Sequence, residues 1–80
     1  MKCQLTYLPL GTAEVTEKVD EVIDVIDGYD LSYRVGEMST LIEGDREEVF
    51  NLINDIYTTQ KDNGSQFRLH VELLSSNNYS

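Results

Sequence analysis

The period of the hydrophobic residues changes several times along the chain, and this pattern is the strongest constraint on the fold. Apolar side chains alternate in residues 2–8, follow a helical stripe in residues 14–27 and alternate again in residues 31–43. A second stripe follows Asp45, and alternation returns from Phe67. Period two indicates a strand with one buried face, whereas a stripe with period 3.6 indicates an amphipathic helix. The predicted order of elements is therefore βαββαβ.

Turn and cap residues predict where these elements end. Pro9 is expected to stop the first strand, and Thr12 is expected to be the N-cap of the first helix. Gly28 is expected to end that helix as a C′ residue, a position that commonly takes a left-handed conformation. Gly36 and Glu37 are expected to form a two-residue type II′ turn, so that the third strand covers residues 38 to 43.

This order predicts an α+β fold of the ferredoxin-like type. Two right-handed βαβ crossovers can form a four-stranded antiparallel sheet with both helices on one face. We expect one domain over residues 1–74 and a flexible C-terminal tail over residues 75–80. The face without helices would meet water or pack on another subunit's sheet, and it would carry Gln4, Thr6, Leu8, Arg34, Arg68, His70 and Glu72.

Composition excludes several classes of partner. The 80 residues include 15 acidic and 6 basic side chains, which gives a net charge of −9 with no basic run. Binding to nucleic-acid phosphates or to anionic membrane surfaces is therefore disfavoured. Cys3 is the only cysteine and His70 the only histidine, so neither an internal disulfide, a metal site nor a cofactor is expected. No signal peptide or membrane span is visible, which favours a cytoplasmic protein.

Two stretches carry a resemblance to a known family. They are Pro9–Thr12 after the first strand and the hairpin Tyr33–Gly36 with Met38, Thr40 and Glu43–Asp45. Over about residues 3–74 the chain resembles the thiamine-binding protein family, the small YkoF-like proteins with a ferredoxin-like fold. The resemblance implies a homo-oligomer, commonly a tetramer built as a dimer of dimers. It also implies binding of thiamine, or of its hydroxymethylpyrimidine part, without catalysis.

The chain departs from the family pattern at two positions inside the hairpin. Glu37 stands where the family usually has proline, which removes a restraint on the turn. Ser39 stands where the family usually has glycine, which adds a side chain where a ligand or a neighbouring backbone could approach closely. Both departures fall where the resemblance places the ligand.

Eight residues are the candidates for a ligand site. They are Thr6, Leu8, Arg34, Glu37, Met38, Ser39, Thr40 and Glu43. Arg34 could hold a carboxylate or phosphate, or it could form a cross-strand or cross-subunit ion pair with Glu43 or Glu72. Glu43 could accept a hydrogen bond from an aminopyrimidine or offset a thiazolium charge, or it could be solvated. The hydroxyl residues could bind a small polar ligand or be ordinary strand residues, and Met38 could pack on a flat ring or fill the core.

Three functions are compatible with these residues. The first is a non-enzymatic binding protein for thiamine or a related pyrimidine, used in vitamin salvage, storage or sensing. The alternative is a homo-oligomeric assembly protein whose pocket is vestigial or takes a different ligand. A third is a small hydrolase or isomerase that uses Glu43 or His70, but the sequence offers no convincing set of acid, base, nucleophile and metal for it.

Overall fold

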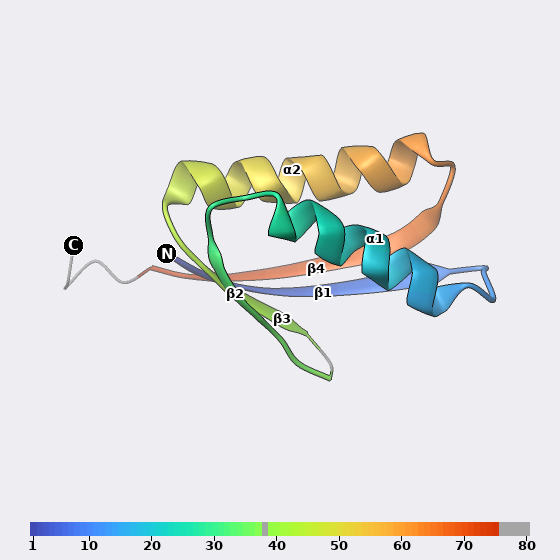
Figure 1. The fold of residues 1–80 in the computed structure, drawn as a ribbon, viewed down its shortest axis with the longest axis horizontal. Coiled ribbons are helices and arrows are strands. Elements are labelled where there is room, and N and C mark those ends of the chain that lie inside the picture. Colours follow the sequence, from blue (N-terminus) through green and yellow to red (C-terminus); the bar gives the residue numbers. More distant parts are fainter. Residues whose placement is uncertain (38, 76–80) are drawn as a thin grey trace.

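A single sheet with two helices stacked on one of its faces makes up the fold (Figure 1). The computed structural model describes residues 1–37 and 39–75. The elements in this part of the chain are β1 (Lys2–Leu10), α1 (Val15–Asp27), β2 (Ser32–Val35), β3 (Thr40–Glu43), α2 (Arg46–Asp62) and β4 (Gln66–Leu74). The predicted ferredoxin-like βαββαβ fold is confirmed. The single domain over residues 1–74 stays a prediction, and residues 76–80 of the predicted tail lie outside the described residues.

The four strands pair in the order β2-β3-β1-β4, and every pairing is antiparallel. β1 pairs with β4 along its whole length, from Lys2 opposite Leu74 to Leu10 opposite Gln66. β1 pairs with β3 only as far as Leu5, which lies opposite Thr40. The second half of β1 therefore has a strand neighbour on one side only.

This one-sided pairing corrects the prediction at Pro9. The residue was expected to stop the first strand, but it lies within β1 and opposite Phe67 of β4. A proline lacks the backbone N–H and is tolerated in a strand only where that side needs no partner. Because β3 does not extend this far, the strand continues through Pro9 to Leu10.

The ends of α1 differ from the expected caps. Thr12 is not the N-cap, because the helix begins two residues later than that would require, after Glu14. The Oγ1 of Thr12 accepts a hydrogen bond from the Glu14 N–H at 3.0 Å, a local turn that leads into the helix. Gly28 does end the helix, but in a right-handed conformation with φ −77°. The Gly28 N–H donates to the Val25 carbonyl at 3.2 Å, so a tightened last turn replaces the left-handed cap.

The hairpin between β2 and β3 turns one residue later than predicted. Val35 pairs with Thr40, and the Gly36 N–H donates to the Ser39 carbonyl at 2.8 Å. Gly36 does not have the positive φ that the first central residue of a type II′ turn requires. The third strand begins at Thr40 and not at residue 38, because its register brings the fully buried Ile42 opposite Tyr33.

The core lies between the sheet and the helices. Its fully buried side chains are Cys3, Leu5, Val22, Ile26, Ile42, Val49, Leu52 and Ile56. Burial of each large apolar side chain stabilises the fold by about 1.5–3 kcal/mol. Cys3, Leu5 and Tyr7 of β1 face the helices, which agrees with the alternation of apolar side chains in residues 2–8. The helices cover β4 only in part. Val71 and Leu73 of this edge strand remain 37% and 41% exposed.

Candidate functional site

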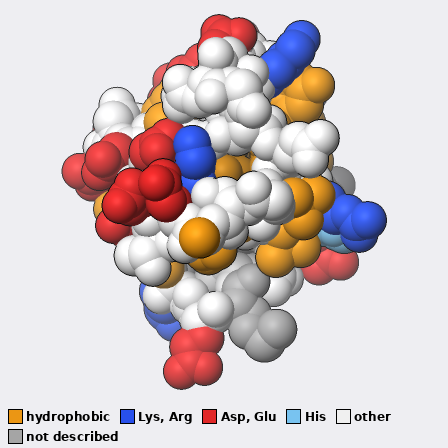
Figure 2. Space-filling view, turned by 90° about the vertical axis from the view of Figure 1, so that its right-hand side faces the viewer, with side chains coloured by type: hydrophobic (Ala, Val, Ile, Leu, Met, Phe, Trp, Pro, Cys, Tyr) orange, Lys and Arg blue, Asp and Glu red, His pale blue; other side chains and the backbone are white. Residues whose placement is uncertain are grey.

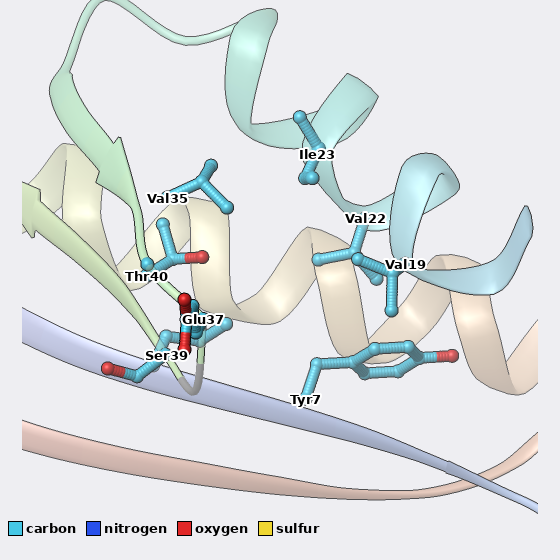
Figure 3. A pocket seen from close by; sticks show the side chains of 10 residues that line it. Tyr7, Val19, Val22, Ile23, Val35, Glu37, Ser39 and Thr40 are labelled. Carbon is cyan, nitrogen blue, oxygen red and sulfur yellow. The ribbon is translucent and has the colours of Figure 1, made fainter. Parts of the chain in front are cut away.

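A cavity opens between α1 and the β2–β3 hairpin, on the helix-covered face of the sheet (Figure 3). Its volume is about 110 Å³. Its lining residues come from four elements and the hairpin turn: Leu5, Tyr7, Val19, Val22, Ile23, Val35, Gly36, Glu37, Ser39 and Thr40. The walls on α1 and β1 are largely apolar, whereas the hairpin supplies polar groups. This combination of apolar walls with a few polar groups is typical of small-molecule sites.

The ring of Tyr7 forms the side of the cavity toward β1. Its hydroxyl donates to Gln60 Oε1 at 2.8 Å, and Gln60 is fully buried. The Gln60 amide in turn donates to Glu21 Oε1 at 3.4 Å. Burial, followed by the nearby charge of Glu21, raises the pKa of the Tyr7 hydroxyl above its usual range. The ring of Tyr7 is therefore held in one orientation by a buried partner.

Thr40 and Glu37 bring polar atoms from the hairpin to the cavity. Thr40 lies opposite Leu5 on β1 and Val35 on β2, so its half-buried side chain faces α1. Glu37 lies in the turn and is exposed to solvent. Figure 3 shows these residues across the cavity from the valines of α1. A hydroxyl and a carboxylate thus face an apolar wall.

Ser39 lines the same cavity, but its hydroxyl is used elsewhere. Ser39 Oγ accepts a hydrogen bond from the Gln4 amide at 2.9 Å. Gln4 of β1 lies opposite Leu41 of β3. Because Gln4 stands between the buried Cys3 and Leu5, its side chain is on the helix-free face. Ser39 therefore lines the cavity, while its hydroxyl links the end of the hairpin turn to β1 on the other face.

Four other candidate residues lie on the helix-free face of the sheet. Thr6 is opposite His70, Leu8 is opposite Arg68, and Arg34 is opposite Leu41. Glu43 follows Leu41 by two residues and shares its face. Thr6 borders a depression of about 340 Å³ whose other lining residues are Gln4, His70, Val71 and Glu72. The structure thus brings Glu37, Ser39 and Thr40 together at the cavity and places Thr6, Leu8, Arg34 and Glu43 on the opposite face. Met38 lies outside the described residues.

Within the described chain, Glu43 forms an ion pair with Lys2 and not with Arg34. Glu43 lies opposite Lys2, and the Lys2 Nζ is 4.0 Å from a Glu43 carboxylate oxygen. The other ion pair in the described part of the chain joins Lys18 to Glu21. Exposed pairs of this kind contribute between about 0 and 1 kcal/mol. Within the described chain, neither Glu43 nor Glu72 forms an ion pair with Arg34.

Sequence reasoning missed the cavity residues on β1 and α1. Tyr7, Val19 and Ile23 line the cavity but were not among the eight candidates for the ligand site. The sequence did show that Tyr7 lies on the buried face of β1. Tyr7 also lies beyond Leu5, which is the last residue of β1 that pairs with β3. Beyond Leu5 no residue of β3 lies beside β1, and the hairpin turn forms that side of the cavity.

In residues 1–37 and 39–75, His, Cys, Asp and Glu side chains form no group of three or more that could hold a metal ion. In the same ranges no helix is both long enough and apolar enough to cross a membrane.

Solved structures resemble this fold over almost the whole chain. The protein MJ1052 of Methanocaldococcus jannaschii matches with a TM-score of 0.72 and 26% identity, over 92% of this chain and 79% of that one. A Bacillus cereus domain of unknown function, DUF77, matches with a TM-score of 0.73 and 20% identity, over 94% of this chain and 76% of that one. A Thermotoga maritima protein, provisionally described as a thiamine biosynthesis or salvage protein, matches with a TM-score of 0.66 and 19% identity, over 92% and 85%. The last two likenesses show the fold alone.

Sequence comparisons show the family. The UPF0045 protein MJ1052 is 32% identical over 57 residues, which cover 70% of this chain and 57% of that relative. The sequence match thus spans little more than half the length of this relative. The family model described as thiamine-binding protein matches residues 3–73. The chain therefore belongs to the thiamine-binding protein family.

Proposed function

We propose that this chain binds thiamine or its hydroxymethylpyrimidine part without catalysing a reaction, and that it serves vitamin salvage or sensing in the cytoplasm. The observation that carries the proposal is the family match over residues 3–73, which includes the whole hairpin. The cavity beside that hairpin is the location that we propose for the ligand.

The chemistry of the cavity suits a flat heteroaromatic ring. The ring of Tyr7 offers a face for stacking, and the valine side chains of α1 close the other side. The Thr40 hydroxyl can donate to or accept from an aminopyrimidine edge. The Glu37 carboxylate and the net charge of −9 favour a cationic thiazolium over an anion.

The size of the cavity bears on how much of the ligand it can enclose. Its volume of about 110 Å³ lies below the ~300–1,000 Å³ of typical pockets for drug-sized ligands. We therefore place the pyrimidine ring inside and the remainder of thiamine outside, beyond Glu37. A second subunit would cover that part in a homo-oligomer, and we propose a tetramer built as a dimer of dimers.

One other function has a specific observation in its favour. Large apolar side chains remain exposed on the described surface, including Phe50, Tyr57 and Leu74 at 47%, 50% and 59%. A protein whose main role is homo-oligomeric assembly would cover them and would need no ligand. Stable oligomers that respond to neither thiamine nor hydroxymethylpyrimidine would identify this alternative.

Isothermal titration calorimetry with each ligand in turn tests the proposal, and two threonine variants test the location. Thr40→Val removes a hydroxyl from the cavity, whereas Thr6→Val makes the same change on the helix-free face. We expect saturable binding that Thr40→Val weakens by roughly 5- to 10-fold, as loss of one hydrogen bond predicts, and that Thr6→Val leaves unchanged. If Thr6→Val weakened binding and Thr40→Val did not, the ligand would bind on the helix-free face. No saturable heat from either ligand, with protein shown to be folded, would reject thiamine-type binding.

A further inference from the structure

One fully buried residue of α2 differs in polarity from the apolar stripe to which it belongs. The stripe contains Val49, Leu52 and Ile56, all fully buried, and Gln60 follows Ile56 by one helical turn with 0% exposure. Among the described residues, Gln60 is the only buried one with a polar or charged side chain. A leucine at this position would complete the stripe, and a buried amide is costly unless its polar atoms find partners. Folding alone therefore does not account for a glutamine here.

The partners of Gln60 come from two other elements and fix how its amide is turned. Gln60 Nε2 donates to Glu21 Oε1 of α1 at 3.4 Å, and Gln60 Oε1 accepts from the Tyr7 hydroxyl of β1 at 2.8 Å. An ionised carboxylate can only accept hydrogen bonds, so the NH2 group of Gln60 faces Glu21 and its oxygen faces Tyr7. The proton of the Tyr7 hydroxyl is therefore committed to Gln60.

Glu21 is itself held by residues nearer the surface. Its carboxylate accepts from Asn63 Nδ2 at 3.1 Å, and Lys18 Nζ lies 3.9 Å from its second oxygen. Lys18 and Asn63 lie at the end of the molecule that carries the β1–α1 loop and the α2–β4 turn. Figure 2 views this end and shows that acidic side chains gather on one side of it. The hydrogen bonds thus run from a carboxylate that is 40% exposed, through a buried amide, to the hydroxyl of Tyr7.

The hydroxyl of Tyr7 points away from the hairpin side of the cavity. Figure 3 shows the ring with its oxygen directed away from Glu37 and Thr40. Phe67 of β4 packs against the same ring, with the two centroids 5.7 Å apart. An open cavity of about 110 Å³ with largely apolar walls is costly, because its lining loses dispersion contacts. A tyrosine free to rotate could swing its ring into this space, and the hydrogen bond to Gln60 opposes that motion.

We propose that Gln60, oriented by Glu21, is a positioning residue of the ligand site, which holds the Tyr7 ring back and keeps the cavity open for the pyrimidine ring. Neither Gln60 nor Glu21 lines the cavity, so both act through Tyr7. An ordered ring favours binding, because the side chain then loses little freedom when the ligand enters. This inference rests on the proposed function, and it assigns a role to residues that do not touch the ligand.

Calorimetry and urea unfolding of Gln60→Leu test this role, because affinity and stability should not fall together. We expect this variant to bind thiamine or hydroxymethylpyrimidine, whichever the wild-type protein binds, roughly 2- to 10-fold more weakly, as the freedom of one side chain predicts. We expect its stability to equal or exceed that of the wild type, because leucine fills the buried space while the half-buried Tyr7 and Glu21 can reach water. Gln66→Leu makes the same change at an exposed position of β4 and is expected to leave affinity unchanged.

A double-mutant cycle separates positioning through Tyr7 from an independent effect of Gln60. Tyr7→Phe keeps the ring but removes its hydroxyl, so we expect it to weaken binding about as much as Gln60→Leu. The double variant is expected to bind no more weakly than either single variant. Losses of affinity that multiply in the double variant would overturn the proposal, because Gln60 would then not act through Tyr7.

The other outcomes are equally decisive. A Gln60→Leu protein that binds as tightly as wild type, or one that loses stability together with affinity, would overturn the positioning role while leaving the proposed function in place. Absence of binding by the folded wild-type protein would reject the proposed function and this role with it. The two failures are therefore recognised separately.

Discussion

The two faces of the sheet are built from the same strands but are used differently. On β1, Leu5 faces the helices and is 2% exposed, whereas Leu8 faces away from them and is 44% exposed. The helix-covered face holds the core, the buried Tyr7–Gln60 hydrogen bond and the cavity. The other face holds Arg34, Glu43 and a mixture of polar and apolar residues, and no helix or strand of residues 1–37 and 39–75 covers it (Figure 1). The same alternating pattern therefore produces a stable interior on one side and a surface available for contacts on the other.

The largest expected effect compares two leucines on β1. We expect Leu5→Ala to lower the free energy of unfolding by about 2–5 kcal/mol, because it removes buried methyl groups and leaves a void in the core. Leu8→Ala makes the same change on the exposed face, and we expect it to cost less than about 1 kcal/mol. Urea unfolding of both variants measures the difference. Equal costs would mean that another subunit buries Leu8, which would break the comparison between the faces.

A second comparison uses two tyrosine hydroxyls. Tyr7→Phe leaves the fully buried Gln60 Oε1 without its donor, and we expect a loss of about 1–3 kcal/mol in the free energy of unfolding. The Tyr33 hydroxyl donates to Asp27 at 3.0 Å in an exposed position, so Tyr33→Phe is expected to cost less than about 1 kcal/mol. Chemical denaturation of the two variants provides the test. A Tyr7→Phe protein as stable as wild type would show that water replaces the lost hydroxyl.

The smallest expected effect is a pH dependence at Tyr29, which connects the end of α1 to α2. Its hydroxyl donates to the Asp55 carboxylate, and this bond, with burial and nearby negative charge, raises the pKa of Tyr29 to about 12. A pKa that is higher in the folded state means that the folded protein holds this proton more tightly. The resulting stabilisation is complete below pH 10 and is lost as the pH rises toward 12.

Ultraviolet absorbance during alkaline titration checks this expectation. Tyr29→Phe should remove the tyrosine that ionises last, and it should flatten the fall of stability between pH 10 and 12. Tyr57→Phe is a matched control on the surface of α2, because Tyr57 is 50% exposed. An unchanged titration curve in Tyr29→Phe would show that the bond to Asp55 does not form in solution.

Much of this fold followed from local pattern. The alternating residues of β1 and the stripe of α1 predicted their elements and their buried faces, because period and burial are linked by backbone geometry. The turn at Gly36 was placed one residue too early, since the position of a turn depends on which pairing buries Ile42. Pro9 was misjudged for a similar reason, because its effect depends on whether a neighbouring strand needs its missing N–H.

The candidate site shows the same division. Glu37 and Thr40 were identified from the hairpin, and they line the cavity. Arg34 and Glu43 were grouped with them because they belong to the same hairpin that resembles the family. Arg34 lies on the helix-free face, as the alternation predicted, so it is on the other side of the sheet from the cavity.

The sequence by itself determined the order of strands and helices, the faces that are buried and the acidic charge of the chain, because these depend on side chains a few residues apart. Only the tertiary structure decided which side of the hairpin faces α1, that Tyr7, Thr40 and Glu37 line one cavity, and which strand is left at the edge. These features depend on contacts between residues far apart in the chain, such as Tyr7 with Gln60 and Leu5 with Thr40. The free energy of packing the whole core selects such contacts, and no local pattern encodes them.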